Sequence, residues 1–287
     1  MRFKSGLFLG LFGLIVVILG GWYFTLTVCF LIHLALLEFF KIAELSGIRP
    51  ATKTTLVLCQ IILIATHFET QGVLDSQLSL SILPISSAVI CGWLILQPVT
   101  GKISDIAASV FGLFYLGFLP SHWIRLRSIS DINNLFWNNN FEQINIISSD
   151  TALIITFSTC LMIVASDIGS YVIGGKFGTH SLTLISPGKT IEGTLGGFLS
   201  SILIGILISI VFKWDNGYYL GILFGFLISL FGLIGDLIES MMKRDAGLKD
   251  SGDVLPGHGG ILDRIDSYIF TPSIIFYLIK FLNNFNF

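Results

Sequence analysis

Long apolar segments recur along the whole chain, and they limit the possible folds more than any other feature. Crossing the hydrocarbon core of a bilayer takes about 20 residues of helix, and fewer inside a packed bundle. The candidate spans are 6–20, 21–43, 54–67, 78–97, 103–125, 151–174, 194–213, 217–239 and 267–283. They are apolar on all faces, whereas the strands of a membrane barrel alternate. Backbone groups in lipid must be satisfied within the segment, so the sequence predicts an all-α, polytopic integral membrane protein with about nine transmembrane helices.

The low content of charge excludes several other classes of protein. Only 12% of the residues are charged and 53% are hydrophobic, and the formal net charge is −2. This is about half the charged share of a soluble domain, which argues against a soluble globule and against a disordered chain. A nucleic-acid-binding protein would show a basic excess, so no nucleic-acid partner is expected. The four cysteines stand alone in apolar segments and are interpreted as core residues.

Charge in the connecting segments predicts an orientation. Twelve of the 16 Lys and Arg residues fall on one side if the N-terminus is cytoplasmic.

Arg2 and Lys4 precede an apolar stretch as in a signal peptide, but the stretch continues past Gly20 and Gly21 without a cleavage pattern, so we expect a retained helical hairpin. The expected location is a bacterial-type inner membrane. We expect N-terminal transmembrane helices over 1–150 and a C-terminal transmembrane catalytic region over 151–287, within one membrane domain. The connection 126–150 suggests no role.

Ionisable residues at membrane depth are costly and indicate function. Asp167 follows an apolar run, and Asp236 and Glu239 follow another. Asp236, Glu239 and Lys243 are spaced three and four residues apart, so they share one helical face. The alternative is that each carboxylate pairs with a basic residue and only locks two helices together.

The charged residues concentrate between positions 236 and 266, on the predicted cytoplasmic side. Glycines 257, 259 and 260 flank His258, and a loop of this kind exposes backbone N–H groups to a phosphate. Carboxylates and cations also alternate there. Mg²⁺ is usually bound by one or two carboxylates together with substrate phosphates, so the segment predicts a metal–polyphosphate site. A solvated loop would explain the charges but not the glycine pattern.

A second candidate element covers 186–193. Lys189 and Thr190 open an apolar run there, and a helix start can bind an anion through side chains and free N–H groups. It is not a Walker loop, because the upstream glycine that this motif needs is absent. An ordinary helix start is the alternative interpretation.

These residues resemble a known family, the phosphatidate cytidylyltransferases or CDP-diacylglycerol synthases. The family motif is matched by Ser240-x-Met242-Lys243-Arg244-x4-Lys249-Asp250-x-Gly252-x2-Leu255-Pro256-x-His258-Gly259-Gly260-Ile261-x-Asp263-Arg264-x-Asp266. Two further elements are similar, Ser186-Pro187-x-Lys189-Thr190-x-Glu192-Gly193 and Asp167-x-Gly169-x-Tyr171 with Gly174 and Gly178. The likeness covers 165–267. Gly188 departs from it, since many members carry a second lysine there.

The resemblance implies a reaction in which CTP and phosphatidate give CDP-diacylglycerol and pyrophosphate, for phospholipid biosynthesis. It also implies dependence on Mg²⁺, with a second cation left open, and a helical fold with a polar cavity facing the cytoplasm. The implied partners are CTP, phosphatidate and the lipid bilayer, and family likeness suggests a homodimer.

The resemblance also implies roles for residues. The expected catalytic residues are Asp236, Lys249, Asp263 and Arg264. The expected metal ligands are Asp236, Asp263, Asp266 and Asp167, the last with an alternative role of orienting a lysine. The expected substrate-binding residues are Ser186, Lys189, Thr190, Glu192, Lys243, Arg244, Asp250, His258, Gly259 and Gly260. For His258, a role in positioning the backbone is an equal alternative.

Three other functions fit the residues less well. Another CTP-dependent membrane lipid kinase would transfer the γ-phosphoryl group instead. A CDP-alcohol phosphatidyltransferase is disfavoured, because its Asp-x2-Asp-Gly-x2-Ala-Arg pattern is missing. An ion-coupled transporter would show broken helices in paired halves, and the sequence shows no paired halves.

Overall fold

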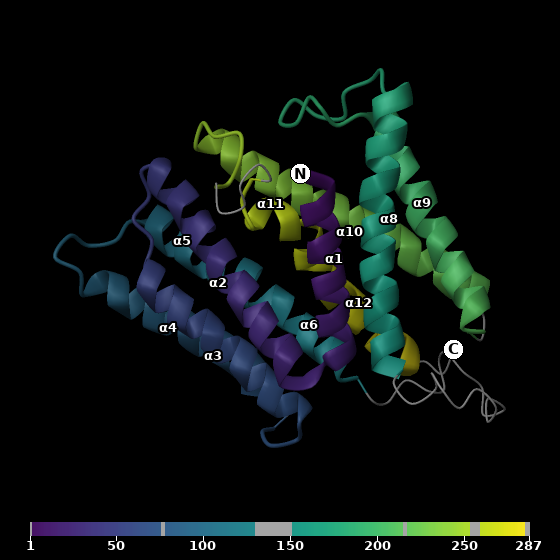
Figure 1. Cartoon of the computed structure of the whole chain (residues 1–287). Coiled ribbons are helices and arrows are strands. Elements are labelled where there is room, and N and C mark those ends of the chain that lie inside the picture. The colour runs from purple at the N-terminus through teal and green to yellow at the C-terminus, as the bar shows by residue number, and fades with distance from the viewer. Residues whose placement is uncertain (1, 76–77, 130–150, 215–216, 253–258, 285–287) are drawn as a thin grey trace. The chain divides into compact units, whose positions relative to one another are not determined.

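The computed structural model describes residues 2–75, 78–129, 151–214, 217–252 and 259–284 (Figure 1). Within these ranges it is helical and contains no strand, which confirms the all-α prediction. One isolated bridge joins Ser181 and Thr190 in the connection before α9.

Every predicted apolar segment coincides with helical structure to within two residues at its ends. The helices are α1 (Arg2–Leu19), α2 (Gly21–Leu45), α3 (Thr52–Thr70), α4 (Leu78–Ile95), α5 (Ile103–Gly112), the π-helical η1 (Leu113–Phe118), α6 (Leu119–Arg127), α8 (Thr151–Phe177), α9 (Ile191–Val211), α10 (Gly217–Asp245), α11 (Leu262–Ile265) and α12 (Ser267–Asn284). The predicted span 103–125 runs through α5, η1 and α6.

Six helical segments of the described chain are long and apolar enough to cross a membrane. They are Gly21–Leu45, Ile103–Arg127, Thr151–Phe177, Ile191–Val211, Gly217–Asp245 and Leu262–Asn283. Gly10–Leu19 and Leu80–Ile95 are shorter apolar helices. The chain is therefore an integral membrane protein of the helical type, and the count of nine crossings stays a prediction.

The chain forms two compact units. Met1–Arg125 and Met241–Ile269 make up unit 1, and Leu126–Ser240 and Phe270–Phe287 make up unit 2. α10 is continuous across the boundary at residue 240. Residues 241–269 thus fold with the N-terminal helices of unit 1. The predicted division into 1–150 and 151–287 stays a prediction.

In unit 1, α2 packs against α3, α5, η1 and α11. Large apolar side chains such as Leu36, Phe40, Ile62 and Leu116 are fully buried there. Asp105 starts α5 by accepting hydrogen bonds from the N–H groups of Lys102 at 2.7 Å and Arg49 at 2.8 Å. The bond from Lys102, the N-cap residue, is that of a capping box, and the bond from Arg49 ties the segment before α3 to the start of α5.

Unit 2 is built on the close approach of α8 and α9, which lie side by side (Figure 1). Small residues recur at every fourth position of α9, at Gly193, Gly197, Ser201 and Gly205. A Cβ atom on Gly197 would lie 3.0 Å from the carbonyl oxygen of Ser166 on α8. This spacing of small residues lets two membrane helices bring their backbones together.

Candidate active site

The two sequence elements predicted to bind phosphate and metal meet in unit 2. The ammonium group of Lys189, just before α9, forms an ion pair with the carboxylate of Asp236 on α10. Thr190 caps α9, because its hydroxyl oxygen accepts a hydrogen bond from Gly193 N–H at 3.1 Å. The cap fixes the start of the helix, and with it the backbone of the preceding lysine. The structure thus brings together Lys189 and Asp236, which the sequence analysis assigned to substrate and metal binding, and those two roles stay predictions.

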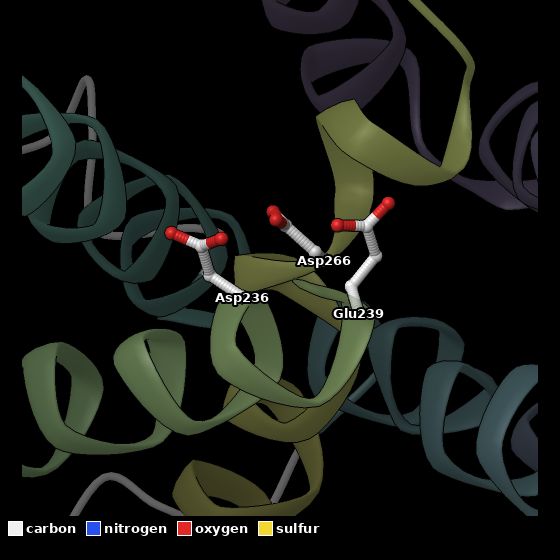
Figure 2. A group of neighbouring side chains, drawn as sticks. All are labelled: Asp236, Glu239 and Asp266. Carbon is white, nitrogen blue, oxygen red and sulfur yellow. The ribbon is translucent and has the colours of Figure 1, made fainter. Parts of the chain in front are cut away.

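Asp236 has a second carboxylate one turn further along α10. Oxygens of Asp236 and Glu239 lie within 4.8 Å of one another, and Glu239 is only 1% exposed. Figure 2 shows these two side chains on successive turns of α10, and it also labels Asp266, the residue after α11. A pair of carboxylates at this spacing is the donor set that hard cations such as Mg²⁺ prefer. Glu239 was recognised on this helical face but not assigned to the site.

In unit 1, Asp263 organises the segment that links α10 to α11. We call its described residues, 246–252 and 259–261, the motif loop. Asp263 Oδ1 contacts Lys243 Nζ at 2.5 Å. Its Oδ2 accepts from Ser251 N–H at 3.0 Å, from the Ser251 hydroxyl at 3.0 Å and from Gly260 N–H at 2.9 Å. Gly259 has φ +77°, which favours glycine. Asp263 therefore binds both described ends of the motif loop through one carboxylate oxygen and Lys243 through the other.

A residue that the sequence analysis missed completes this arrangement. Glu38 of α2 is 5% exposed, and its carboxylate accepts hydrogen bonds from Ile261 N–H at 2.9 Å and Leu262 N–H at 2.8 Å. The Ser251 hydroxyl lies 3.0 Å from Glu38 Oε2. A sequence signal existed, because Glu38 is an ionisable residue inside the predicted span 21–43.

Asp266 and Asp167 occupy different settings. Asp266 is 9% exposed, and its Oδ1 accepts a hydrogen bond from Ser267 N–H at 2.6 Å. Asp167 is exposed on α8. Their assignment as metal ligands stays a prediction.

The remaining predicted catalytic and substrate-binding residues lie near helix ends or in the connecting loops. Lys249, Asp250 and Arg264 are exposed, and the guanidinium group of Arg244 donates to the carbonyl oxygen of Leu248 at 2.9 Å. The carbonyl oxygen of Ser186 accepts a hydrogen bond from Lys189 N–H at 3.0 Å, which makes a tight turn before the lysine. His258 lies outside the described residues.

Glu192 holds a local turn. Its carboxylate accepts from the Thr179 hydroxyl at 2.7 Å and contacts His180 Nδ1 at 2.7 Å. The backbone N–H groups of both residues also point to it, at 3.2 and 3.3 Å. Glu192 therefore ties the end of α8 to the start of α9, and its predicted contact with substrate stays a prediction.

Comparison with known proteins agrees with the motif. Residues 1–282 match the cytidylyltransferase family. The chain is 41% identical to a phosphatidate cytidylyltransferase of Synechocystis over 274 residues, which are 92% of this chain and 91% of that protein. It is 35% identical to the chloroplastic phosphatidate cytidylyltransferase 4 of Arabidopsis thaliana, covering 92% of this chain and 69% of the relative. A phosphatidate cytidylyltransferase of Bacillus subtilis is 27% identical, with 97% and 96% covered. The match extends over both compact units, and the chain belongs to the cytidylyltransferase family.

Proposed function

We propose that this protein is a CTP:phosphatidate cytidylyltransferase, a membrane nucleotidyltransferase that makes CDP-diacylglycerol and pyrophosphate for phospholipid biosynthesis. The observation that carries the proposal is the likeness to proteins named phosphatidate cytidylyltransferase, at 41% identity over most of the chain. The lysine and carboxylate groups of the matched motifs, in the ion pairs Lys189–Asp236 and Lys243–Asp263, suit a metal–polyphosphate substrate.

The reaction needs charge compensation more than acid–base chemistry. A phosphate oxygen of phosphatidate attacks the α-phosphorus of CTP, a new P–O bond forms, and the bond to the β-phosphate breaks to release pyrophosphate. The attacking oxygen is already anionic near neutral pH, so no strong general base is required. Two polyanions must instead be held in line, which is a task of positioning and electrostatic stabilisation.

The lysines and arginines of the motifs supply this stabilisation. We assign Lys189 and Lys243 to the triphosphate, since each is held in place by a carboxylate before substrate binds. Arg264, Arg244 and Lys249 are the remaining cations of the motif, and an arginine can bind a phosphate through two N–H groups at once. Asp236 and Asp263 orient the two lysines.

The carboxylates of α10 fit a Mg²⁺ ion. We propose that Asp236 and Glu239 bind it, which adds Glu239 to the ligand set predicted from the sequence. Asp266 stays a predicted ligand. Asp263 already accepts from three donor groups of the motif loop and contacts Lys243, and its role as a metal ligand stays a prediction. Asp167 is the candidate for a second cation. A bound cation would supply positive charge to stabilise the negative charge that develops on the phosphates.

We further propose that nine helices cross a bacterial-type inner membrane and enclose a polar cavity that opens to the cytoplasm. The distribution of lysine and arginine favours this orientation. It also gives the site a reason to lie at the interface: the acyl chains of phosphatidate stay in the bilayer while CTP arrives from water. A homodimer is proposed on family likeness alone.

The test is incorporation of radiolabelled CTP into lipid by the purified protein with phosphatidate and Mg²⁺. We expect label from the α-phosphate and the cytidine to enter the lipid, with release of pyrophosphate. Release of CDP together with label transfer from the γ-phosphate would identify a lipid kinase instead. For the orientation, a cysteine introduced at exposed Asp250 should react with a membrane-impermeant reagent only from the cytoplasmic side, and reaction from outside would reverse it.

A further inference from the structure

We infer that Glu38, in the N-terminal half of the chain, is a positioning residue for nucleotidyl transfer. It holds the motif loop in the shape that places Lys243 and Asp263. The inference rests on the proposed function and deepens it, because it assigns a task to a helix outside the segment that carries the family motif. The contacts that support it all lie within unit 1.

The carboxylate of Glu38 receives three donor groups. Oε1 accepts from Ile261 N–H at 2.9 Å, and Oε2 accepts from Leu262 N–H at 2.8 Å and lies 3.0 Å from the Ser251 hydroxyl. Ile261 and Leu262 begin α11, where backbone N–H groups have no partner inside the helix. Only a carboxylate offers two acceptor oxygens at one side-chain end, since an amide offers one oxygen and one N–H donor.

Two glycines of the motif leave the space that Glu38 occupies. A Cβ atom on Gly260 would collide with Glu38 Oε2 and with the Ser251 hydroxyl, and one on Gly252 would lie 3.0 Å from Glu38 Oε1. The sequence interpretation attributed the motif glycines to phosphate approach. At these two positions the structure gives a different reason, because the loop backbone closes around a side chain from α2. A carboxylate that only stabilised α2 would not require glycine on its partner.

The contacts continue from Glu38 to the lysine of the site. The Ser251 hydroxyl lies 3.0 Å from both Glu38 Oε2 and Asp263 Oδ2, and its single proton is donated to one of them at a time. The other oxygen of Asp263 contacts Lys243 Nζ at 2.5 Å. A displacement of the motif loop therefore moves the partner of Lys243. Glu38 acts through these residues and touches no reacting atom.

Glu38→Gln in the purified full-length protein tests the inference, with Glu44→Gln as the matched control. Glu44 lies on the same helix and is exposed, so the control makes the same chemical change outside the loop. In Glu38→Gln we expect KM for CTP to rise and kcat/KM for CTP to fall about 100-fold, as for a small misplacement of the groups that hold the nucleotide. We expect KM for phosphatidate to stay within about twofold of the wild-type value. Glu44→Gln should match the wild type in both.

Amide hydrogen exchange gives a readout that does not depend on activity. The N–H groups of Ile261 and Leu262 should exchange about tenfold faster in Glu38→Gln than in Glu44→Gln, because they lose a charged acceptor. A merely structural role would lower the amount of active protein, and with it kcat, while both KM values stayed constant.

Several outcomes would overturn the inference. Wild-type CTP kinetics in Glu38→Gln would do so, as would a fall in kcat with no change in KM for CTP. If Glu38→Gln does not fold, Ser251→Ala removes one of the three donors, and we expect a loss of about tenfold in kcat/KM for CTP; no loss would also refute the inference. A wild-type protein that makes no CDP-diacylglycerol would instead refute the proposed function, and the exchange experiment would still test the Glu38 contacts.

Discussion

The family motifs contain two lysine–aspartate pairs that look alike in the sequence and differ in their surroundings. Lys189–Asp236 in unit 2 is partly exposed, with 22% and 35% of the two side chains accessible. Lys243–Asp263 in unit 1 is nearly enclosed, at 11% and 13%. Asp263 is also bonded to Ser251 and Gly260, whereas Asp236 has Glu239 one turn away as a second acid.

This difference indicates that the two lysine–aspartate pairs have different tasks, although the sequence motif gives both the same residue types. A carboxylate with an acidic neighbour and solvent access is suited to exchange its lysine for a cation and a phosphate. A carboxylate that already accepts three hydrogen bonds holds a loop in place, and its loss leaves buried donors unpaired. We therefore expect the first pair to act mainly in chemistry and the second mainly in positioning.

The largest effect is expected for Asp236→Asn. The amide keeps the size of the side chain but removes the charge that attracts both the cation and Lys189. Turnover of CTP should fall about 1000-fold or more, and the Mg²⁺ concentration for half-maximal activity should rise about 10- to 100-fold. Thermal unfolding of the purified protein should change little. Wild-type dependence on Mg²⁺ would contradict the assignment of Asp236 to the metal.

Asp263→Asn should also impair the enzyme, by about 100-fold, but for a different reason. The amide nitrogen would face the N–H groups of Ser251 and Gly260 or the ammonium group of Lys243, so the motif loop should loosen. We expect a lower midpoint of thermal unfolding together with a higher KM for CTP. Near-wild-type turnover would reject both the metal role and the positioning role of Asp263.

The sequence predicted the features of the two pairs that depend on local residue spacing. Apolar segments of sufficient length become helices, and Asp236, Glu239 and Lys243 share a face because of their spacing on one helix. Lys189 and Asp236 were assigned to substrate and metal, and their ion pair corresponds to the alternative that each carboxylate pairs with a basic residue. These predictions needed no knowledge of which distant segments touch.

The sequence did not predict the contacts that close the motif loop. Glu38 lies on α2, far from the loop in the chain, and helical periodicity says nothing about which helix packs on which. Likewise, spacing cannot distinguish a carboxylate that binds a metal from one that binds backbone N–H groups, so Asp263 and Asp236 received the same role. The contacts of Glu192 with Thr179 and His180 were missed for the same reason.

Replacement of each lysine by alanine should show the difference between the two pairs in protein stability. Lys189→Ala removes a cation next to Asp236, and we expect KM for CTP to rise about 10- to 100-fold, with unchanged thermal unfolding. Lys243→Ala should raise KM for CTP to a similar extent but should also destabilise the protein, because Asp263 is left in a nearly enclosed setting. Equal stability of the two variants would remove the distinction between the pairs.

Gly260→Ala tests the enclosed pair through its backbone. The added methyl group would collide with Ser251 and Glu38, and overpacking of this kind costs about 1–3 kcal/mol of folding stability. Gly247→Ala is not a suitable control, since Gly247 has φ +69°. Gly175→Ala on α8 is suitable, because nothing lies within 4 Å of the added atom. Only Gly260→Ala should lower the unfolding midpoint.

The smallest effect is expected for Glu192→Gln, which lies outside both pairs although it belongs to the same motif as Lys189. Glu192 ties Thr179 and His180 to the start of α9, and an exposed amide can still accept a hydrogen bond from Thr179. Activity should therefore fall only about two- to fivefold, as for other exposed ion pairs. Glu192→Ala should cost more, because it releases the turn that precedes Lys189. A loss of activity as large as that of Asp236→Asn would instead place Glu192 in contact with substrate. Glu192 would then act in the reaction together with Asp236 and Glu239.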